Sequence, residues 1–172
     1  LLDDKDMQSR AKKYMDAILS RQQEDGWICP CAPEERWGYD MWALILMAKV
    51  MMVYAECSGD ERIVPALTAA LRNFNSRIDS RTLFNWGAAR WFEALIPIFW
   101  LYEKTGDEWL LDLAHKLRVQ GIDYQTLFEH YRDMVPQRRW TFLTHVVNLS
   151  MCLKSGALIS RLYGGDPSSF AR

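Results

Sequence analysis

Two kinds of helical pattern alternate along this chain. Apolar residues recur with a helical period in six segments, and three of these, residues 5–22, 60–76 and 107–119, have one apolar and one polar face. The other three segments, residues 40–57, 87–105 and 144–163, are apolar nearly all round. Because a helix of the second kind is normally enclosed by other helices, the order predicts outer and inner helices in alternation. No segment of comparable length alternates with a period of two, so the chain is predicted to be all-α.

A glycine followed by aspartate recurs near the end of each apolar segment. Gly59, Gly106 and Gly165 are spaced 47 and 59 residues apart, and VYAECSGDERIVPAL at 53–67 aligns with WLYEKTGDEWLLDL at 100–113. We expect a left-handed glycine to end each inner helix and the aspartate to cap the next helix. A repeat of two helices predicts three stacked αα-hairpins in a single domain spanning residues 1–172.

The connections differ in length at the two ends of these predicted hairpins. The glycine turns are short, whereas the connections at residues 23–39, 78–86 and 119–143 are long and should gather at the opposite end, where binding sites are usually found. Tryptophan rings suit the C–H faces of sugars, and they also seal loops onto a core, so both interpretations stay open. Six of the eight tryptophans are predicted at that end: Trp27, Trp37, Trp42, Trp86, Trp91 and Trp140.

Two pairs of polar residues interrupt the enclosed segments. Arg90 and Glu93 lie three residues apart, as do His145 and Asn148, and this spacing places each pair on one helix face. Buried polar groups are costly unless they are paired. Arg90 and Glu93 therefore form either a structural ion pair or part of a site. His145 and Asn148 are either a satisfied core pair or ligand contacts.

Charge and composition exclude several classes of partner. The net charge is -1 and the basic residues are scattered, which argues against nucleic acid and anionic membranes as partners. Lys49 interrupts the longest apolar run, so no membrane span is expected. Cys29 and Cys31 form a C-x-C without a second Cys or His pair nearby, so no metal site is expected. No signal peptide is recognisable, which leaves the compartment open with the cytoplasm as the preferred assignment.

Several stretches in this order resemble one enzyme family. QQEDGWI, RWGYDMWALILMAKVMMVYAE, WGAARWFEALIPIFWLYEKTGDEWLLDLAHKL, QGIDY and THVVNLSMCLK are similar to the N-terminal half of the catalytic domain of the β-L-arabinofuranosidase glycoside hydrolases, family 127 and its relatives. The resemblance covers nearly the whole chain. It implies an (α/α)6 barrel of which this chain supplies three hairpins. It also implies retaining hydrolysis of L-arabinofuranosides by a zinc-held cysteine nucleophile and a glutamate acid/base.

The resemblance also implies roles for particular residues. The THVVN stretch matches the family's sugar-contacting histidine segment, so His145 and Asn148 are expected to bind substrate, and Glu93 matches a glutamate of the second inner helix. The RWGYDMW stretch lacks the histidine that better-studied members have near position 42. The remaining residues expected to bind sugar border the long-loop end: Trp27, Arg36, Trp37, Trp86 and Arg90.

The family's catalytic apparatus lies further along the chain than residue 172. None of the four cysteines matches it, so no cofactor is expected in this segment, and Glu93 and Asp40 are the only local candidates for catalysis. The chain is thus expected to be a fragment that binds carbohydrate.

Half a toroid would leave inner-helix surface open, which predicts self-association or a C-terminal half. A helical-repeat interaction module without catalysis is the alternative. A terpenoid cyclase is disfavoured because QQEDGW departs from the Q-x-x-x-G-x-W motif and the acidic motifs are missing.

Overall fold

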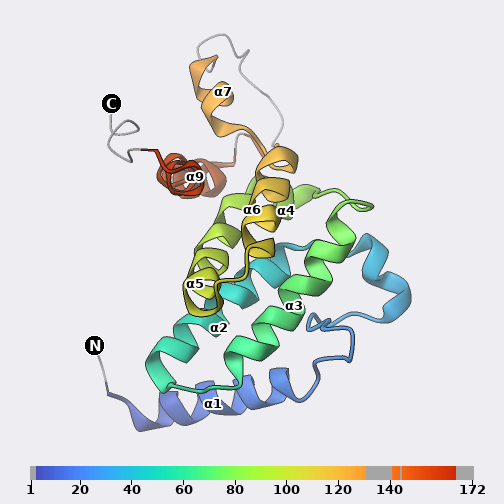
Figure 1. The fold of residues 1–172 in the computed structure, drawn as a ribbon, viewed down its shortest axis with the longest axis vertical. Coiled ribbons are helices and arrows are strands. Elements are labelled where there is room, and N and C mark those ends of the chain that lie inside the picture. Colours follow the sequence, from blue (N-terminus) through green and yellow to red (C-terminus); the bar gives the residue numbers. More distant parts are fainter. Residues whose placement is uncertain (1–2, 131–140, 144, 166–172) are drawn as a thin grey trace.

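The computed structural model describes residues 3–130, 141–143 and 145–165. All regular elements within these ranges are helices and none is a strand, which confirms the all-α prediction (Figure 1). The α-helices are α1 (Lys5–Leu19), α2 (Trp42–Ser58), α3 (Ile63–Ile78), α4 (Asn85–Ala89), α5 (Leu95–Thr105), α6 (Trp109–Gln120), α7 (Tyr124–Glu129), α8 (Val146–Cys152) and α9 (Ser155–Tyr163). Two 3-10 helices, η1 (Pro33–Gly38) and η2 (Trp91–Ala94), complete the described elements.

Two antiparallel hairpins, α2–α3 and α5–α6, lie side by side at the centre of the molecule (Figure 1). α2 ends at Gly59 with φ 68° and α5 ends at Gly106 with φ 73°, so both glycines adopt the left-handed conformation predicted for the turns. Among the described helices, the third that ends on a left-handed glycine is α9, at Gly164 with φ 69°, and the prediction of Gly165 is wrong by one residue. Gly165 instead donates its N–H to the carbonyl of Ser160 at 2.8 Å, which closes the cap that Gly164 begins.

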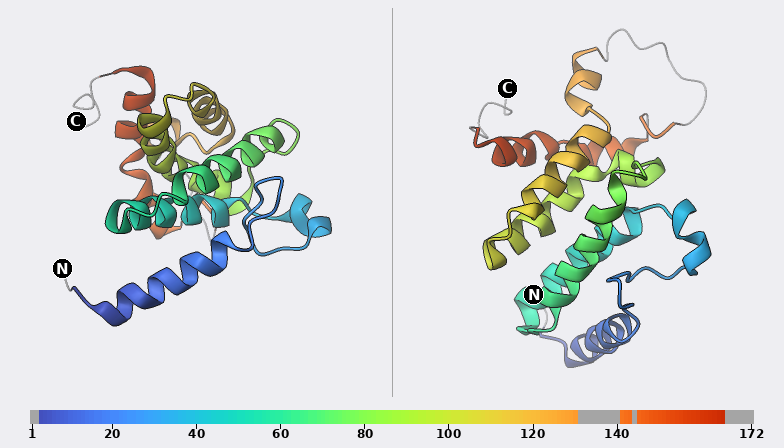
Figure 2. Two further views of the ribbon diagram at one scale, coloured as in Figure 1. Left: turned by 60° about the horizontal axis from the view of Figure 1, so that its bottom comes forward. Right: turned by 45° about the vertical axis from the view of Figure 1, so that its right-hand side comes forward.

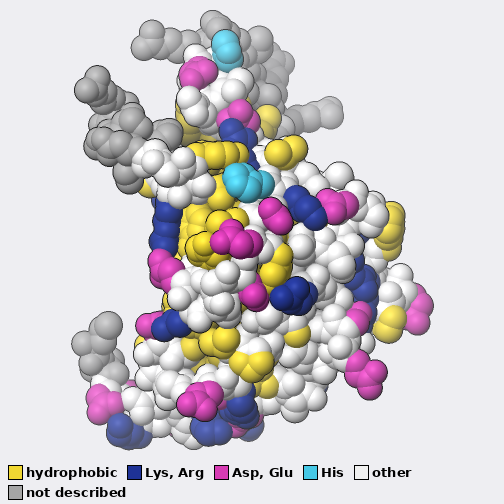
Figure 3. Space-filling view, in the orientation of Figure 1, with side chains coloured by type: hydrophobic (Ala, Val, Ile, Leu, Met, Phe, Trp, Pro, Cys, Tyr) yellow, Lys and Arg dark blue, Asp and Glu magenta, His cyan; other side chains and the backbone are white. Residues whose placement is uncertain are grey.

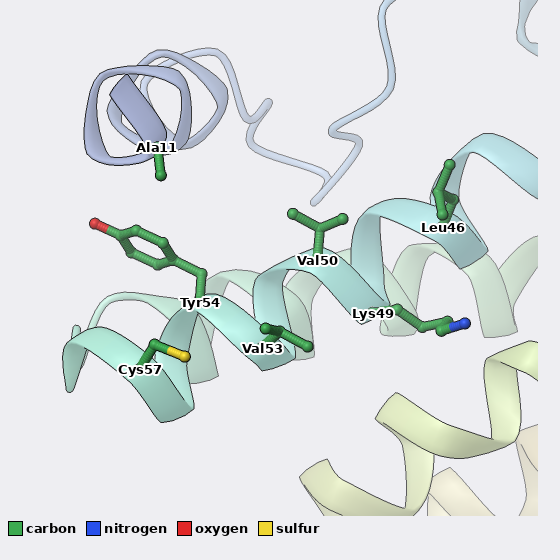
Figure 4. A pocket seen from close by; sticks show the side chains of 7 residues that line it. All are labelled: Ala11, Leu46, Lys49, Val50, Val53, Tyr54 and Cys57. Carbon is green, nitrogen blue, oxygen red and sulfur yellow. The ribbon is translucent and has the colours of Figure 1, made fainter. Parts of the chain in front are cut away.

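The first and last helical segments depart from the expected hairpin arrangement. α1 crosses α2 steeply instead of running alongside it, and it buries Met15 alone among its residues (Figures 2 and 4). Residues 144–163 do not form one helix, because the chain breaks at Leu153 and Lys154 between α8 and α9. α9 then crosses α6 (Figure 2).

The second apolar segment is divided as well. α4 ends at Ala89, the backbone of the next residue, Arg90, is not helical at φ -122° and ψ 20°, and the chain continues through η2 into α5. Pro97 is the third residue of α5, where no intrahelical N–H bond is required, so the proline interrupts no hydrogen bond. Because of this division, the side chains before and after Arg90 do not follow one continuous helix.

The buried core joins the two hairpins through η2. Apolar side chains from α2, α3, η2, α5 and α6 fill this region, and their burial is the main stabilising contribution to the fold. The largest fully buried side chains are Trp91, Phe92, Ile45, Met51, Ile63, Leu67, Leu71, Ile78, Leu95, Ile98, Leu101 and Leu110. This core holds α4 and the start of α2 in fixed positions at one end of the hairpins.

Candidate functional site

Arg90 lies between two tryptophan rings at the end of α4. Its guanidinium carbon is 4.8 Å from the centre of the Trp42 ring and 4.5 Å from that of Trp86, within the range of cation–π attraction. The Nε group donates to Oδ1 of Asn148 at 2.8 Å. Among the described residues no acceptor engages the other four N–H groups, and the side chain is half-buried. Burial lowers the pKa of the Arg90 guanidinium, which still stays charged at neutral pH.

Asn148 fixes the start of α8 against this cation. Its side chain is fully buried, and Nδ2 donates to the carbonyl of Phe142 at 2.9 Å while Oδ1 accepts from Arg90. The Asn148 backbone N–H donates to Nδ1 of His145 at 3.4 Å, so His145 caps α8. The Trp86 ring meets the rings of Phe142 and His145 edge-on, at 4.8 and 5.3 Å between centres. Residues far apart in the sequence therefore form one cluster.

Asp40 holds the two tryptophans in position. Its Oδ1 accepts hydrogen bonds from the backbone N–H groups of Trp42 and Gly87, and its Oδ2 accepts one from Trp86, all at 2.9 Å. One carboxylate thus joins the start of α2 to the start of α4. Both oxygens accept hydrogen bonds from the backbone, so in this structure Asp40 is a structural link between the two helix starts.

Glu93 is fully buried and faces two lysines. Lys49 from α2 donates to Oε2, and Nζ of Lys154 lies 2.6 Å from Oε1, a charge contact outside hydrogen-bonding geometry. The ion pair considered between Arg90 and Glu93 is not formed. Arg90 has a non-helical backbone at the junction of α4 and η2, and its guanidinium lies against Asn148 and the two tryptophans instead of Glu93.

Two of the other predicted site residues belong to a separate buried cluster. Trp27 is 3% exposed and donates from Nε1 to the carbonyl of Cys29 at 2.7 Å. Arg36 stacks on the Trp27 ring at 4.7 Å and pairs with Asp25 at 2.7 Å. Their side chains fasten the 23–39 connection to the core. Trp37 is 69% exposed on η1, away from both clusters.

The Trp42–Arg90–Trp86 cluster with His145 and Asn148, called the Arg90 site below, includes a residue that sequence reasoning does not assign to it. The sequence predicts Trp42 in the first turn of an inner helix but not in the site. Lys49 stands out in the sequence only as an interruption of the apolar run, although a lone charge in an enclosed helix requires a partner. Trp140, predicted at the same end, lies outside the described residues.

The cysteines are free thiols with contrasting surroundings. Burial raises the pKa of Cys29 to about 12 and that of Cys152 to about 11, so both stay protonated at neutral pH. Cys31 is half-buried and Cys57 is exposed. Within the described ranges, no group of three His, Cys, Asp or Glu side chains is arranged to hold a metal ion.

Thiol labelling should separate these cysteines. At about pH 8 we expect Cys57 to react first and Cys29 and Cys152 to react at least about tenfold more slowly, because the thiolate is the reactive form. Mass spectrometry of a dilute native sample, alkylated over time, measures the rates. Adding urea should abolish the difference. Equal rates in the native protein would contradict the burial of Cys29 and Cys152.

No family model matches this chain, and no curated protein or solved structure matches it. The resemblance to the β-L-arabinofuranosidases therefore rests on the quoted sequence stretches alone. None of the described helices combines the length and the apolar character that a membrane crossing requires.

Proposed function

We propose that the Arg90 site binds carbohydrate. The observation that carries this proposal is a half-buried guanidinium, held between two aromatic faces, with four N–H donors that no described acceptor engages. Sugars present hydroxyl acceptors and apolar C–H faces together, and arginine beside tryptophan complements both. Asn148 fixes the orientation of the guanidinium, so the donors are held in place before a ligand arrives.

The chain would supply this surface to a glycoside hydrolase acting on L-arabinofuranoside-like sugars. Hydrolysis requires an acid and a nucleophile or base across the scissile bond. Asp40 is engaged by three backbone N–H groups and Glu93 by two lysines, which supports assigning catalysis to residues outside this chain. The family's zinc would belong with those residues. On this proposal, α2–α3 and α5–α6 are two hairpins of an (α/α)6 toroid.

A helical-repeat interaction module is the second candidate. It is favoured by a specific observation: α2 exposes Leu46, Val50 and Val53, while Trp27 and Trp91 are packed away. Hydrophobic side chains also follow the left-hand side of the molecule between α9 and α1 (Figure 3). Exposed apolar surface of this kind is typical of protein-binding faces.

Sugar titration tests the first candidate. We expect L-arabinose and short arabinofuranosides to change the tryptophan fluorescence, and Arg90→Met to weaken binding at least about tenfold, because it removes the donors that face the ligand. Arg72→Met is the matched control, since Arg72 also stacks on a tryptophan, Trp109 at 4.4 Å, but on the exposed side of α3.

Two results would contradict a carbohydrate site here. One is an unchanged spectrum at roughly 50 mM sugar, a concentration at which even weak binding is visible. The other is equal affinity in Arg90→Met and the wild-type protein. Circular dichroism of Arg90→Met verifies that the helices remain folded, so that a loss of binding reports on the site.

A further inference from the structure

The face of α2 that turns away from the core carries an uncovered apolar stripe. Leu46, Val50 and Val53 are 46%, 47% and 54% exposed, and Cys57 continues the stripe at the end of the helix. Their spacing of four, three and four residues is that of a helix–helix seam. The stripe lines an open groove of about 480 Å³, whose other side is formed by Ala11 of α1 (Figure 4).

α1 carries a second uncovered stripe with matching spacing. Met7 and Tyr14 are 59% and 66% exposed, and Ala11 lies between them, so the residues again follow each other by four and three. α1 crosses its own α2 steeply, and Ala11 is the one α1 residue that lines the groove, so the α2 stripe stays exposed (Figure 4). Each molecule therefore presents both halves of a helix–helix contact, and neither half is satisfied within the molecule.

The charges at the two stripes are complementary. Lys49 is the only charged residue that lines the groove within the described chain, and it shares Glu93 with Lys154, which leaves one positive charge in excess. Residues 3–6 at the start of α1 are exposed and carry three aspartates against one lysine; Asp3 pairs with Lys5 and Asp6 with Arg10 on the surface, and an acidic excess remains at this helix start. An acidic helix start placed beside the two lysines would be attracted to them.

We propose that α1 of one copy of this chain docks on the α2 stripe of a second copy, reciprocally about a two-fold axis. The helices run parallel, with Met7 against Leu46 and Val50, and Tyr14 towards Cys57. This direction brings the acidic start of α1 beside Lys49. Because each copy supplies both stripes, the interface contains the contact twice, as an isologous dimer requires. The proposal does not depend on the carbohydrate site.

Sedimentation velocity across a concentration series up to roughly 0.1 mM tests this interface. We expect a dimer whose dissociation constant rises at least about tenfold in Val50→Asp and in Tyr14→Asp, because each places a charge in an apolar contact. Asp6→Lys should also weaken the dimer, and the difference in dissociation constant between this variant and the wild-type protein should become smaller at raised salt. Val119→Asp is the matched control: Val119 is 83% exposed on α6, outside both stripes, and the dimer should persist.

Each alternative partner for the α2 stripe gives a distinct result in the sedimentation experiment. A monomer at every concentration overturns the proposal and leaves the groove to another segment or another protein. A dimer that survives Val50→Asp overturns it as well. A dimer that is lost in Val50→Asp but kept in Tyr14→Asp overturns the α1–α2 arrangement, since it indicates α2 pairing with itself. Circular dichroism establishes whether each variant is folded. If Val50→Asp does not fold, the result for Tyr14→Asp decides whether the proposed interface exists.

Discussion

The double substitution Lys49→Met and Lys154→Met is expected to lower the free energy of unfolding by about 4 kcal/mol, because it leaves a buried carboxylate without a partner. Glu93 is fully buried, and these two lysines are the only cations that contact it among the described residues. Urea unfolding followed by circular dichroism measures the change as a shift of the midpoint.

A matched control distinguishes the effect of leaving the buried Glu93 without a partner from the effect of simply removing two lysines. Lys104 and Lys116 pair with acidic residues on the surface, and replacing both with methionine should cost less than about 1 kcal/mol. Adding Glu93→Gln to the Lys49→Met, Lys154→Met protein should recover part of the loss, since a neutral amide is less costly to bury than a carboxylate. Equal stability of the two double variants would show that the Glu93 cluster contributes nothing.

Gly26→Ala is the second substitution with a large expected effect. Gly26 has φ 87°, and a Cβ there would lie 2.2 Å from the backbone carbonyl oxygen of Ala69 on α3. A left-handed residue with a side chain costs about 1–2 kcal/mol, and crowding against a backbone atom that cannot turn aside costs about 1–3 kcal/mol. We expect a loss of about 3 kcal/mol in the free energy of unfolding.

Gly38→Ala is the control for this site. Gly38 belongs to the same connection and lacks a left-handed backbone, and a Cβ added to it would meet no atom within 4 Å. Its substitution should therefore change the free energy of unfolding by less than about 0.5 kcal/mol. Thermal or urea unfolding compares the two variants. Similar stabilities would mean that the 23–39 connection is not held tightly against α3.

The helices and two turns were predictable because their causes are local. The apolar period over residues 40–57 and the glycines at 59 and 106 indicated α2 and the hairpin ends, and the structure agrees. The crossing of α1 and the break between α8 and α9 were not predictable. They depend on how helices pack against distant residues, and a periodic pattern gives a helix face without giving its direction.

Several residues of the candidate site could be named from the sequence, but the contacts between them could not. The structure brings Arg90, Trp86, His145 and Asn148 together, and their binding role stays a prediction. Sequence reasoning assumed an unbroken helix through Arg90 and Glu93, and the passage into η2 separates them. Asp40 illustrates a second limit, because its three bonds go to backbone groups that no pattern of side chains can reveal.

The short left-handed turns also bear on the order in which the chain folds. α2 with α3, and α5 with α6, are joined through Gly59 and Gly106 by only a few residues, so their contacts form at small loop-closure cost and should appear early. α1 leaves the ribosome before these hairpins exist and has little to pack against until they do. Its docking onto α2 and α3 is therefore expected to be a late step, although it is the first of these helices to be synthesised.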